Sequence, residues 1–332
     1  MTRLPGGPVP APSPSAADAP ATIPPPVPDG PGAAAVQSGA TSAPAPPPAS
    51  AGAGRPVVEV IAAGKRYGTD TAGVVALQGI DLTIAQGEFL SLIGPSGCGK
   101  STLLRLIGDL TEPTTGEIRV NGKPARQARL DHDYGMVFQA PVLMDWRTVE
   151  KNVQLPLEIM GIPGPERARR AAALLDLVEL GEFARRYPWQ LSGGMQQRVA
   201  IARALALYPG LLLMDEPFGA LDEMTRERMN LELMNLWRRV GTTIVFVTHS
   251  VPEAVFLSTR VVVMSPRPGR IAKEVTIDLP QPRTAGTREE VQYFRLLTEV
   301  REALRRDDGH SARGDGRPAT SEAERVRAEG PP

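Results

Sequence analysis

A run of small and polar residues near the first third of the chain has the residue types that bind phosphate groups. It matches G-x-x-x-x-G-K-[ST] at every fixed position, with the residues Gly94, Pro95, Ser96, Gly97, Cys98, Gly99, Lys100, Ser101 and Thr102. Small residues let backbone N–H groups approach phosphate oxygens, and a helix that begins beside the loop adds its positive dipole end. We expect the loop to bind a triphosphate such as ATP, with Lys100 at the β- and γ-phosphates and Ser101 on Mg²⁺.

Two carboxylates, Asp215 and Glu216, directly follow the apolar run at 211–214. Ligands of open α/β sheets lie at the carboxyl ends of strands. We therefore expect Asp215 to hold Mg²⁺ through water, and Glu216 to orient or deprotonate the attacking water. Two acids alone would more often cap a strand toward solvent, but downstream of a phosphate-binding loop the hydrolytic interpretation is favoured.

These groups need strands and helices to position them. Apolar runs predict strands at 57–61, 88–94, 117–120, 134–138, 211–215, 243–248, 260–264 and 272–277. Helices are predicted between them, at 102–110, 165–180, 193–207 and 225–240. The alternation predicts an α/β fold of the P-loop NTPase type, with a mixed, mainly parallel sheet and flanking helices. A helical insertion subdomain and a small antiparallel β part complete the predicted fold.

Composition divides the chain into four parts. Residues 1–55, rich in Pro, Ala and Gly, are expected to be a disordered extension because they bury too little apolar surface to offset ordering entropy. Residues 56–283 form the expected ATP-binding domain, with its helical subdomain at about 141–190. A C-terminal helical segment is expected at 284–306 and a disordered tail at 307–332.

The overall composition excludes several classes of protein. Lys plus Arg and Asp plus Glu are 37 each among 332 residues, so there is no basic excess and we expect no nucleic-acid partner. The single cysteine, Cys98, excludes an internal disulfide and lies at a variable motif position, so we assign it no catalytic role. No apolar run approaches the ~18 residues of a membrane span, and no signal peptide is evident, so we expect neither membrane insertion nor export by that route.

Residues 191–198, Leu-Ser-Gly-Gly-Met-Gln-Gln-Arg, resemble the LSGGQ signature of the ATP-binding cassette (ABC) family, with Met195 in place of the final Gln. Ser192 can cap the following helix, where Gly193 and Gly194 would expose N–H groups. The resemblance implies that these four residues close on the γ-phosphate of ATP held by a partner subunit. It implies a head-to-tail pair, most simply a homodimer, with two ATP molecules between the subunits.

The resemblance covers residues 57–283 and implies further roles. Tyr67 matches the aromatic residue that stacks on adenine, and Gln139 the hinge glutamine that touches Mg²⁺ or water. Asp222 matches the loop that crosses to the partner subunit, and His249 the histidine at the γ-phosphate. Alone, Tyr67 would more often be a half-buried strand residue and His249 a structural histidine. The expected catalytic set is thus Glu216, His249, Gln139 and Lys100.

Two further segments, 146–153 and 267–271, look like the nitrate/sulfonate/taurine-type importer branch of the family. This implies an ATP-hydrolysing subunit that powers import of such an anion or a related small compound. The implied partners are transmembrane permease subunits and a solute-binding protein. The implied location is cytoplasmic, on the inner face of the cell membrane. These motifs do not identify the solute.

Two alternatives remain at this point. An ABC-type ATPase of DNA repair or translation would need a long coiled-coil insertion, a second motif set or zinc cysteines, and the sequence has none of these. A non-catalytic ATP-sensing module is disfavoured by the intact Asp215, Glu216 and His249.

Overall fold

The structure is a computed structural model that describes residues 56–68 and 73–311. The expected disordered extension at 1–55, and residues 312–332 of the disordered tail expected at 307–332, lie outside the described residues. Within the two described ranges, no helix combines the length and the apolar character needed to cross a membrane.

The central sheet has six strands in the order β10-β9-β3-β8-β7-β6. Its strands are β3 (Phe89–Ile93), β6 (Tyr134–Val137), β7 (Leu211–Asp215), β8 (Thr243–Val247), β9 (Arg260–Met264) and β10 (Ile271–Thr276). Neighbours from β9 to β6 pair in parallel, whereas β10 runs antiparallel to β9 at one edge. Every residue of β3, β7 and β8 is buried, as expected for parallel strands covered on both faces. The predicted mixed, mainly parallel sheet is confirmed.

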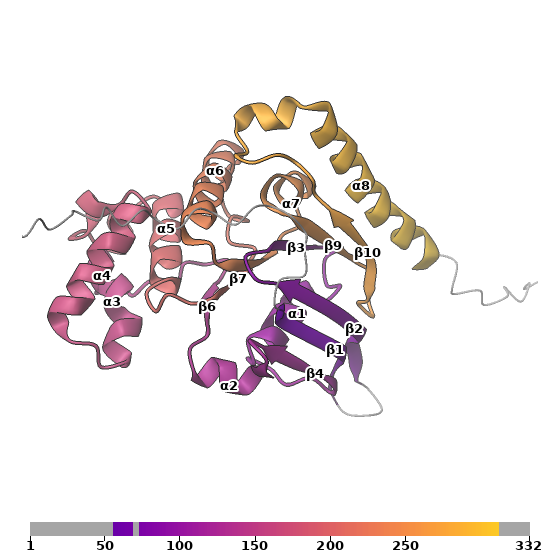
Figure 1. Ribbon diagram of the computed structural model, residues 1–332, viewed down its shortest axis with the longest axis horizontal. Coiled ribbons are helices and arrows are strands. Elements are labelled where there is room, and N and C mark those ends of the chain that lie inside the picture. The colour runs from indigo at the N-terminus through magenta and orange to yellow at the C-terminus, as the bar shows by residue number, and fades with distance from the viewer. Residues whose placement is uncertain (1–55, 69–72, 312–332) are drawn as a thin grey trace, which may run out of the picture. The chain divides into compact units, whose positions relative to one another are not determined.

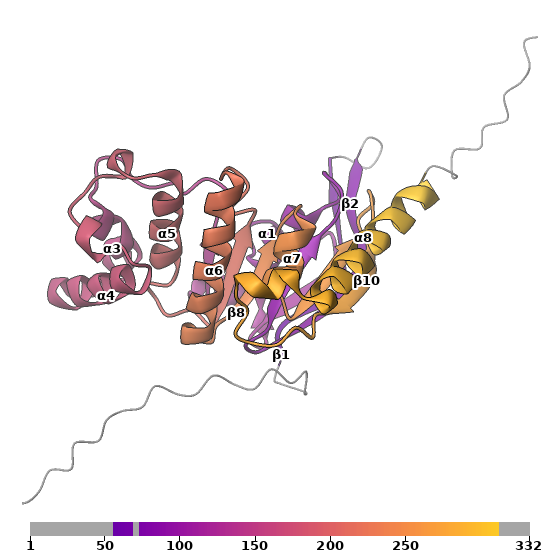
Figure 2. The same cartoon turned by 90° about the horizontal axis from the view of Figure 1, so that it is seen from above.

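Alternate residues of the central strands point into two different cores. Leu90 and Leu92 pack with α1 (Lys100–Ile107), whereas Phe89 and Ile93 contribute to the core on the other face. Figures 1 and 2 show three helices over that other face, namely α6 (Glu223–Val240), α7 (Val251–Leu257) and α8 (Val291–Ser311). The backbone of α8 continues beyond residue 306, where the sequence predicts the C-terminal helical segment to end.

A second, antiparallel sheet has the order β2-β1-β4-β5 and packs against α1. Its strands are β1 (Pro56–Tyr67), β2 (Val74–Ala85), β4 (Thr115–Val120) and β5 (Lys123–Pro124), and α2 (Ala125–Leu130) follows. Val58 pairs with Ile84 on one side and with Val120 on the other. The small antiparallel part is therefore confirmed, although the sequence analysis did not predict β2 as a strand.

The helical insertion lies between β6 and β7 and is confirmed as a separate group of helices (Figure 1, left). It contains α3 (Val149–Ile159), α4 (Gly164–Leu177) and α5 (Gly193–Ala204), with single 3-10 turns at Gly181–Phe183 and Pro188–Gln190. Thr148 caps α3 by accepting a hydrogen bond from the Lys151 N–H, which is why the helix begins there. Leu157, Leu174 and Val199 are buried between the three helices.

Candidate active site

The phosphate-binding motif forms the turn between β3 and α1. Gly99 has φ of +107°, and a Cβ atom there would lie 2.6 Å from Cδ2 of Leu77. Glycine is therefore required both by conformation and by space. Gly99 is also the N-cap of α1 and has no side chain to occupy the N–H groups of the first turn. Those N–H groups can bind an anion, as the motif predicts.

Lys100 lies across the inside of this turn and is 6% exposed. Its Nζ donates hydrogen bonds to the carbonyl oxygens of Gly94 at 2.8 Å and Pro95 at 3.1 Å. Cys98 is buried beneath the loop, and burial raises the pKa of its thiol although the Lys100 ammonium acts in the opposite direction. A neutral, buried thiol is a poor nucleophile, which agrees with giving Cys98 no catalytic role.

Ser101, in the first turn of α1, contacts Asp215 at the carboxyl end of β7. Oγ of Ser101 donates a hydrogen bond of 2.7 Å to Oδ1 of Asp215, which is 9% exposed. Among the described residues no group of three His, Cys, Asp or Glu side chains forms a metal cage. A hydroxyl and a carboxylate in contact nevertheless suit Mg²⁺, which usually takes one or two protein oxygens and completes its shell with phosphate and water.

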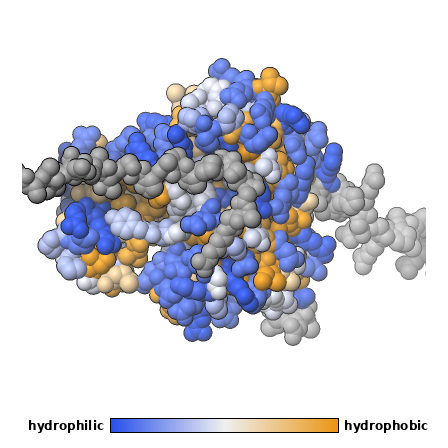
Figure 3. Space-filling view, in the orientation of Figure 1, coloured by the Kyte–Doolittle hydropathy of each residue, from blue (hydrophilic) through white to orange (hydrophobic). Residues whose placement is uncertain are grey.

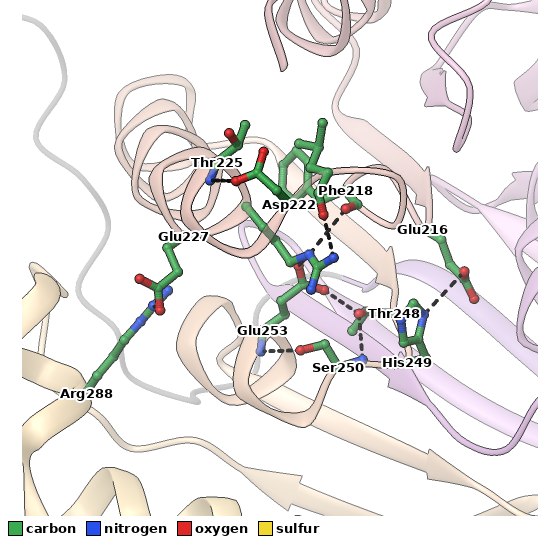
Figure 4. Close-up of polar contacts among 12 residues, drawn as sticks. Glu216, Phe218, Asp222, Thr225, Glu227, Thr248, His249, Ser250, Glu253 and Arg288 are labelled. Atoms are coloured by element: carbon green, nitrogen blue, oxygen red, sulfur yellow. Dashed lines mark hydrogen bonds and ion pairs between the residues drawn. The ribbon is translucent and has the colours of Figure 1, made fainter. Parts of the chain in front are cut away.

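Glu216 directly follows β7 and adopts an unusual backbone conformation. Its φ is +45°, which is uncommon for a residue with a side chain, and its N–H donates to the Val247 carbonyl at 3.0 Å. The conformation turns the side chain toward His249, so that Oε2 of Glu216 lies 3.4 Å from Nδ1 of the histidine (Figure 4). The side chain of His249 is 58% exposed, so it remains accessible to a ligand.

Several of these residues border one open pocket of about 270 Å³, just below the range of small-ligand sites, about 300–1,000 Å³, whereas Asp215 and His249 are not part of its lining. The predicted residues in its lining are Tyr67, Ser96, Gly97, Gly99, Lys100, Ser101, Thr102 and Glu216. Tyr67 is 42% exposed at the end of β1, with its ring 5.2 Å from the Lys65 ammonium. An accessible aromatic face at the pocket edge is suited to stacking on a flat base.

Three further residues line the pocket and were missed by the sequence analysis: Val74, Ala76 and Arg267. Arg267 lies in the turn between β9 and β10, and its Nη2 donates to the Gly97 carbonyl at 3.2 Å. The turn is fastened to β2, because the Gly269 N–H donates to the Ala76 carbonyl at 2.9 Å. In the sequence, residues 267–271 indicate only a branch of the family, and nothing in them predicts a contact with the phosphate-binding loop.

The signature residues lie away from this pocket, at the start of α5. Oγ of Ser192 accepts a hydrogen bond from the Met195 N–H at 3.3 Å, which makes Ser192 the predicted cap. Gly193 is exposed, but Gly194 is buried, and a Cβ atom there would lie 3.1 Å from the Thr225 methyl group. The tight approach of α5 to α6 accounts for the second glycine.

Gln139 and Asp222 also lie outside the pocket lining. Gln139 is exposed after β6, and a Cβ atom on Gly219 would lie 3.2 Å from its Nε2. Asp222 caps α6 by accepting a hydrogen bond from the Thr225 N–H at 3.0 Å, and this lowers the pKa of its carboxyl group. Both therefore flank the loop that follows Glu216.

Comparisons with known proteins point to one family. A family model described as ABC transporter matches residues 77–219. The nitrate import ATP-binding protein of Synechocystis is 47% identical over 251 residues, which cover 74% of this chain and 92% of that protein. The taurine import ATP-binding protein of Rhizobium johnstonii is 44% identical over 241 residues, which cover 72% and 90%.

A solved structure of the ATP-binding cassette MJ0796, a dimer in a post-hydrolysis state bound to ADP and Pi, is similar in fold. It is 37% identical to this chain with a TM-score of 0.58, and the match covers 66% of this chain and 98% of that one.

Proposed function

The chain belongs to the family of ABC transporter ATP-binding proteins, and from this premise we propose that it hydrolyses ATP to power a membrane importer of a small anion. The observation that carries the proposal is the contact of Ser101 with Asp215 beside a pocket that Lys100 and Glu216 also line. The pocket is thus lined by part of the phosphate-binding loop, by Ser101 as one ligand suited to Mg²⁺ and by a carboxylate for water activation, and Asp215 contacts Ser101 beside it.

ATP binding uses the backbone and two side chains of this pocket. The N–H groups of the loop and of the first turn of α1 bind phosphate oxygens. Lys100 exchanges its contacts with the loop carbonyls for the β- and γ-phosphates, and Tyr67 stacks on the adenine. Ser101 would ligate Mg²⁺ directly, and Asp215 and Gln139 would hold its water shell. The bound ion would supply charge neutralisation at the phosphates.

Hydrolysis requires a group that orients water and a group that contacts the γ-phosphate. Glu216 supplies the first because its carboxylate borders the pocket at the strand end. His249 supplies the second from the neighbouring loop after β8. Their separation of 3.4 Å lets the two side chains act on the same phosphate.

The active assembly is a homodimer in which each subunit completes the site of the other. Ser192, Gly193, Gly194 and Met195 lie outside their own pocket, at an exposed helix start that suits a γ-phosphate. MJ0796 was solved as a dimer, which supports this arrangement. Asp222 lies in the loop that crosses to the partner subunit. Shifting the equilibrium between separated and paired subunits from 1:99 to 99:1 needs about 5.5 kcal/mol of differential binding. Two bridging ATP molecules supply this free energy.

The permease subunits bind the helical insertion. Figure 3 shows hydrophobic surface over this part of the molecule, at the lower left. Three of its large apolar side chains are mostly exposed, namely Trp146 at 77%, Ile159 at 74% and Trp189 at 70%. Exposed apolar groups of this size are typical of interaction surfaces. The protein then acts on the cytoplasmic face of the membrane, and a solute-binding protein delivers the solute.

The solute class follows from the relatives whose names state nitrate or taurine import. Both solutes are small and carry an anionic oxygen group, so we propose nitrate, a sulfonate or a related compound.

The test uses purified protein with Mg²⁺ and ATP. The wild type is expected to hydrolyse ATP, and Glu216→Gln to bind ATP, turn over slowly and elute as a stable dimer. Wild-type turnover by Glu216→Gln would remove Glu216 from its role. Transport is tested with the permease and solute-binding protein in vesicles, where uptake of nitrate or taurine must depend on ATP.

A further inference from the structure

The helix that follows His249 begins with a buried carboxyl group. Glu253 is 6% exposed and lies in the first turn of α7. Its Oε2 accepts a hydrogen bond from the Thr248 hydroxyl at 2.5 Å, and that hydroxyl oxygen accepts one from the Ser250 N–H at 3.0 Å. Ser250 in turn caps α7 by accepting from the Glu253 N–H at 3.4 Å. Both chain neighbours of His249 are therefore held by Glu253 (Figure 4).

The second oxygen of Glu253 faces Arg226, near the start of α6. Nε of Arg226 lies 3.7 Å from Oε1 of Glu253. The same guanidinium donates to the carbonyl oxygens of Phe218 at 3.3 Å and Leu221 at 2.6 Å. These carbonyls belong to the loop that connects Glu216 to α6. Arg226 therefore holds the loop on the Glu216 side, as Glu253 holds the loop on the histidine side.

The placement of Glu253 is costly for stability. Burial raises the pKa of its carboxyl group, and Thr248, Arg226, His249 and Arg288 act in the opposite direction without cancelling it. Oε1 of Glu253 accepts no hydrogen bond within the described part of the chain. An incompletely paired carboxylate in such a position destabilises the folded state relative to a neutral group of the same shape. A residue kept against such a cost is expected to serve activity.

We propose that Glu253 and Arg226 are a positioning pair that fixes the loop of His249 against the loop from Glu216 to Asp222. The proposal rests on the proposed roles of Glu216 and His249 in hydrolysis. Neither member of the pair lines the pocket, so the pair acts through the two loops and makes no contact with ATP. The pair then keeps His249, Glu216 and the loop that contains Asp222 in fixed positions relative to one another.

This arrangement separates catalysis from nucleotide binding. The phosphate-binding loop and Tyr67 are built on β3, α1 and β1, whereas the pair joins α6 to α7. Loss of the pair is therefore expected to lower kcat while leaving KM and the Kd for ATP within twofold.

The experiment is a double-mutant cycle on the full chain with Glu253→Gln, Arg226→Met and the double variant. ATP turnover, the Kd for ATP and the thermal unfolding midpoint are measured for each protein. Each single variant is expected to lose about tenfold in kcat, a coupling of the size found within polar networks. The double variant is expected to be no slower than the slower single variant, because either change alone breaks the link.

Stability distinguishes positioning from a structural role. Glu253→Gln removes the buried charge, so its midpoint is expected to equal or exceed that of the wild type while kcat falls. A lower midpoint with unchanged turnover per folded molecule would show a structural role and overturn the proposal. If either single variant fails to fold, Thr248→Val tests the same link without changing a charge, and wild-type kcat in that variant would also overturn it.

The matched control is Arg228→Met, two positions along α6 from Arg226. The side chain of Arg228 is 61% exposed and lies 3.7 Å from Glu232 on the same helix, so its variant is expected to keep kcat within twofold. If the losses of kcat in the two single variants add up in the double variant, coupling through the pair is contradicted.

The test of the positioning pair can fail independently of the test of the proposed function. A wild type that hydrolyses ATP through Glu216, combined with unaffected Glu253 and Arg226 variants, refutes only the positioning pair.

Discussion

The hydroxyl of Ser101 donates a 2.7 Å hydrogen bond to the carboxylate of Asp215, and this contact joins two motifs that are 114 residues apart in the chain. It forms because β3 and β7 lie on either side of β8, so that their carboxyl ends meet at one edge of the sheet. Under the proposed function, this contact lies where Mg²⁺ and the phosphates would bind.

Asp215→Asn is expected to lower ATP turnover about 10²-fold, the size typical of losing one preorganised charged contact. It is also expected to raise the Mg²⁺ concentration that gives half-maximal rate, because the amide is a weaker ligand for a hard cation. Turnover measured across a Mg²⁺ titration checks both effects. Asp278→Asn, which changes an exposed carboxylate, should leave the titration unchanged.

Lys100→Ala is expected to lose affinity for ATP and turnover together, since its ammonium is the cation inside the loop. A loss of about 10²–10³ in rate is expected for one such contact. Arg105→Ala removes a charge from the exposed face of the same helix and serves as the control. Equal rates for the two variants would refute the assignment of the loop.

Gly99→Ala is expected to destabilise the protein by about 1–3 kcal/mol, because the residue has positive φ and its new Cβ would clash with Leu77. ATP binding should weaken as the loop is displaced. Gly210→Ala is the control, since a Cβ atom there meets nothing within 4 Å. Urea unfolding of both variants, with ATP binding measured in parallel, tests the requirement for glycine.

Arg267→Ala is expected to raise the Kd for ATP about fivefold to tenfold, because a hydrogen-bonding cation is removed from the pocket edge. Arg270→Ala is a close control, since Arg270 lies in the same turn but donates to Gln78 at 2.8 Å. The Kd values are compared by titration with a fluorescent ATP analogue. If Arg270→Ala weakens binding as much as Arg267→Ala, the turn as a whole matters rather than the pocket contact.

Alkaline pH tests the packing of Tyr134 against α1. Burial raises the pKa of Tyr134 to about 12, and its hydroxyl donates to the Gly108 carbonyl. Because of the raised pKa, Tyr134 stays protonated to a higher pH in the folded state than in the unfolded state. The stabilisation contributed by the protonated Tyr134 hydroxyl is therefore complete below about pH 10 and is lost as pH rises toward 12. Tyr134→Phe should unfold less steeply with pH in this window, whereas Tyr208→Phe, at an exposed tyrosine, should match the wild type.

Local motifs predicted much of the site. Glu216 directly follows the apolar strand β7, and Lys100 and Ser101 follow β3 after the phosphate-binding loop, so their placement near the strand ends could be inferred from the chain alone. Arg267 could not be found in this way, because its contact with Gly97 spans 170 residues and depends on the pairing of its turn with β2. The Glu253 contact with Arg226 likewise depends on how α6 and α7 pack.

The strand β2 was missed for a related reason. Only part of β2 is buried, and buried Leu82 and Ile84 alternate with exposed Asp81 and Thr83. An alternating segment with polar residues gives a weaker apolar signal than β7, in which all residues are buried. Its identity as a strand follows from its pairing with β1, which a search for apolar runs does not detect.

The position of Ser192 outside its own pocket has a kinetic consequence. Under the proposed pairing a single subunit does not have a complete active site, so two subunits must associate before each turnover. At high dilution, with saturating ATP, the rate should rise with the square of the subunit concentration. A chain defective in Ser192 should also impair the site of an intact chain that it binds, although its own pocket is unchanged.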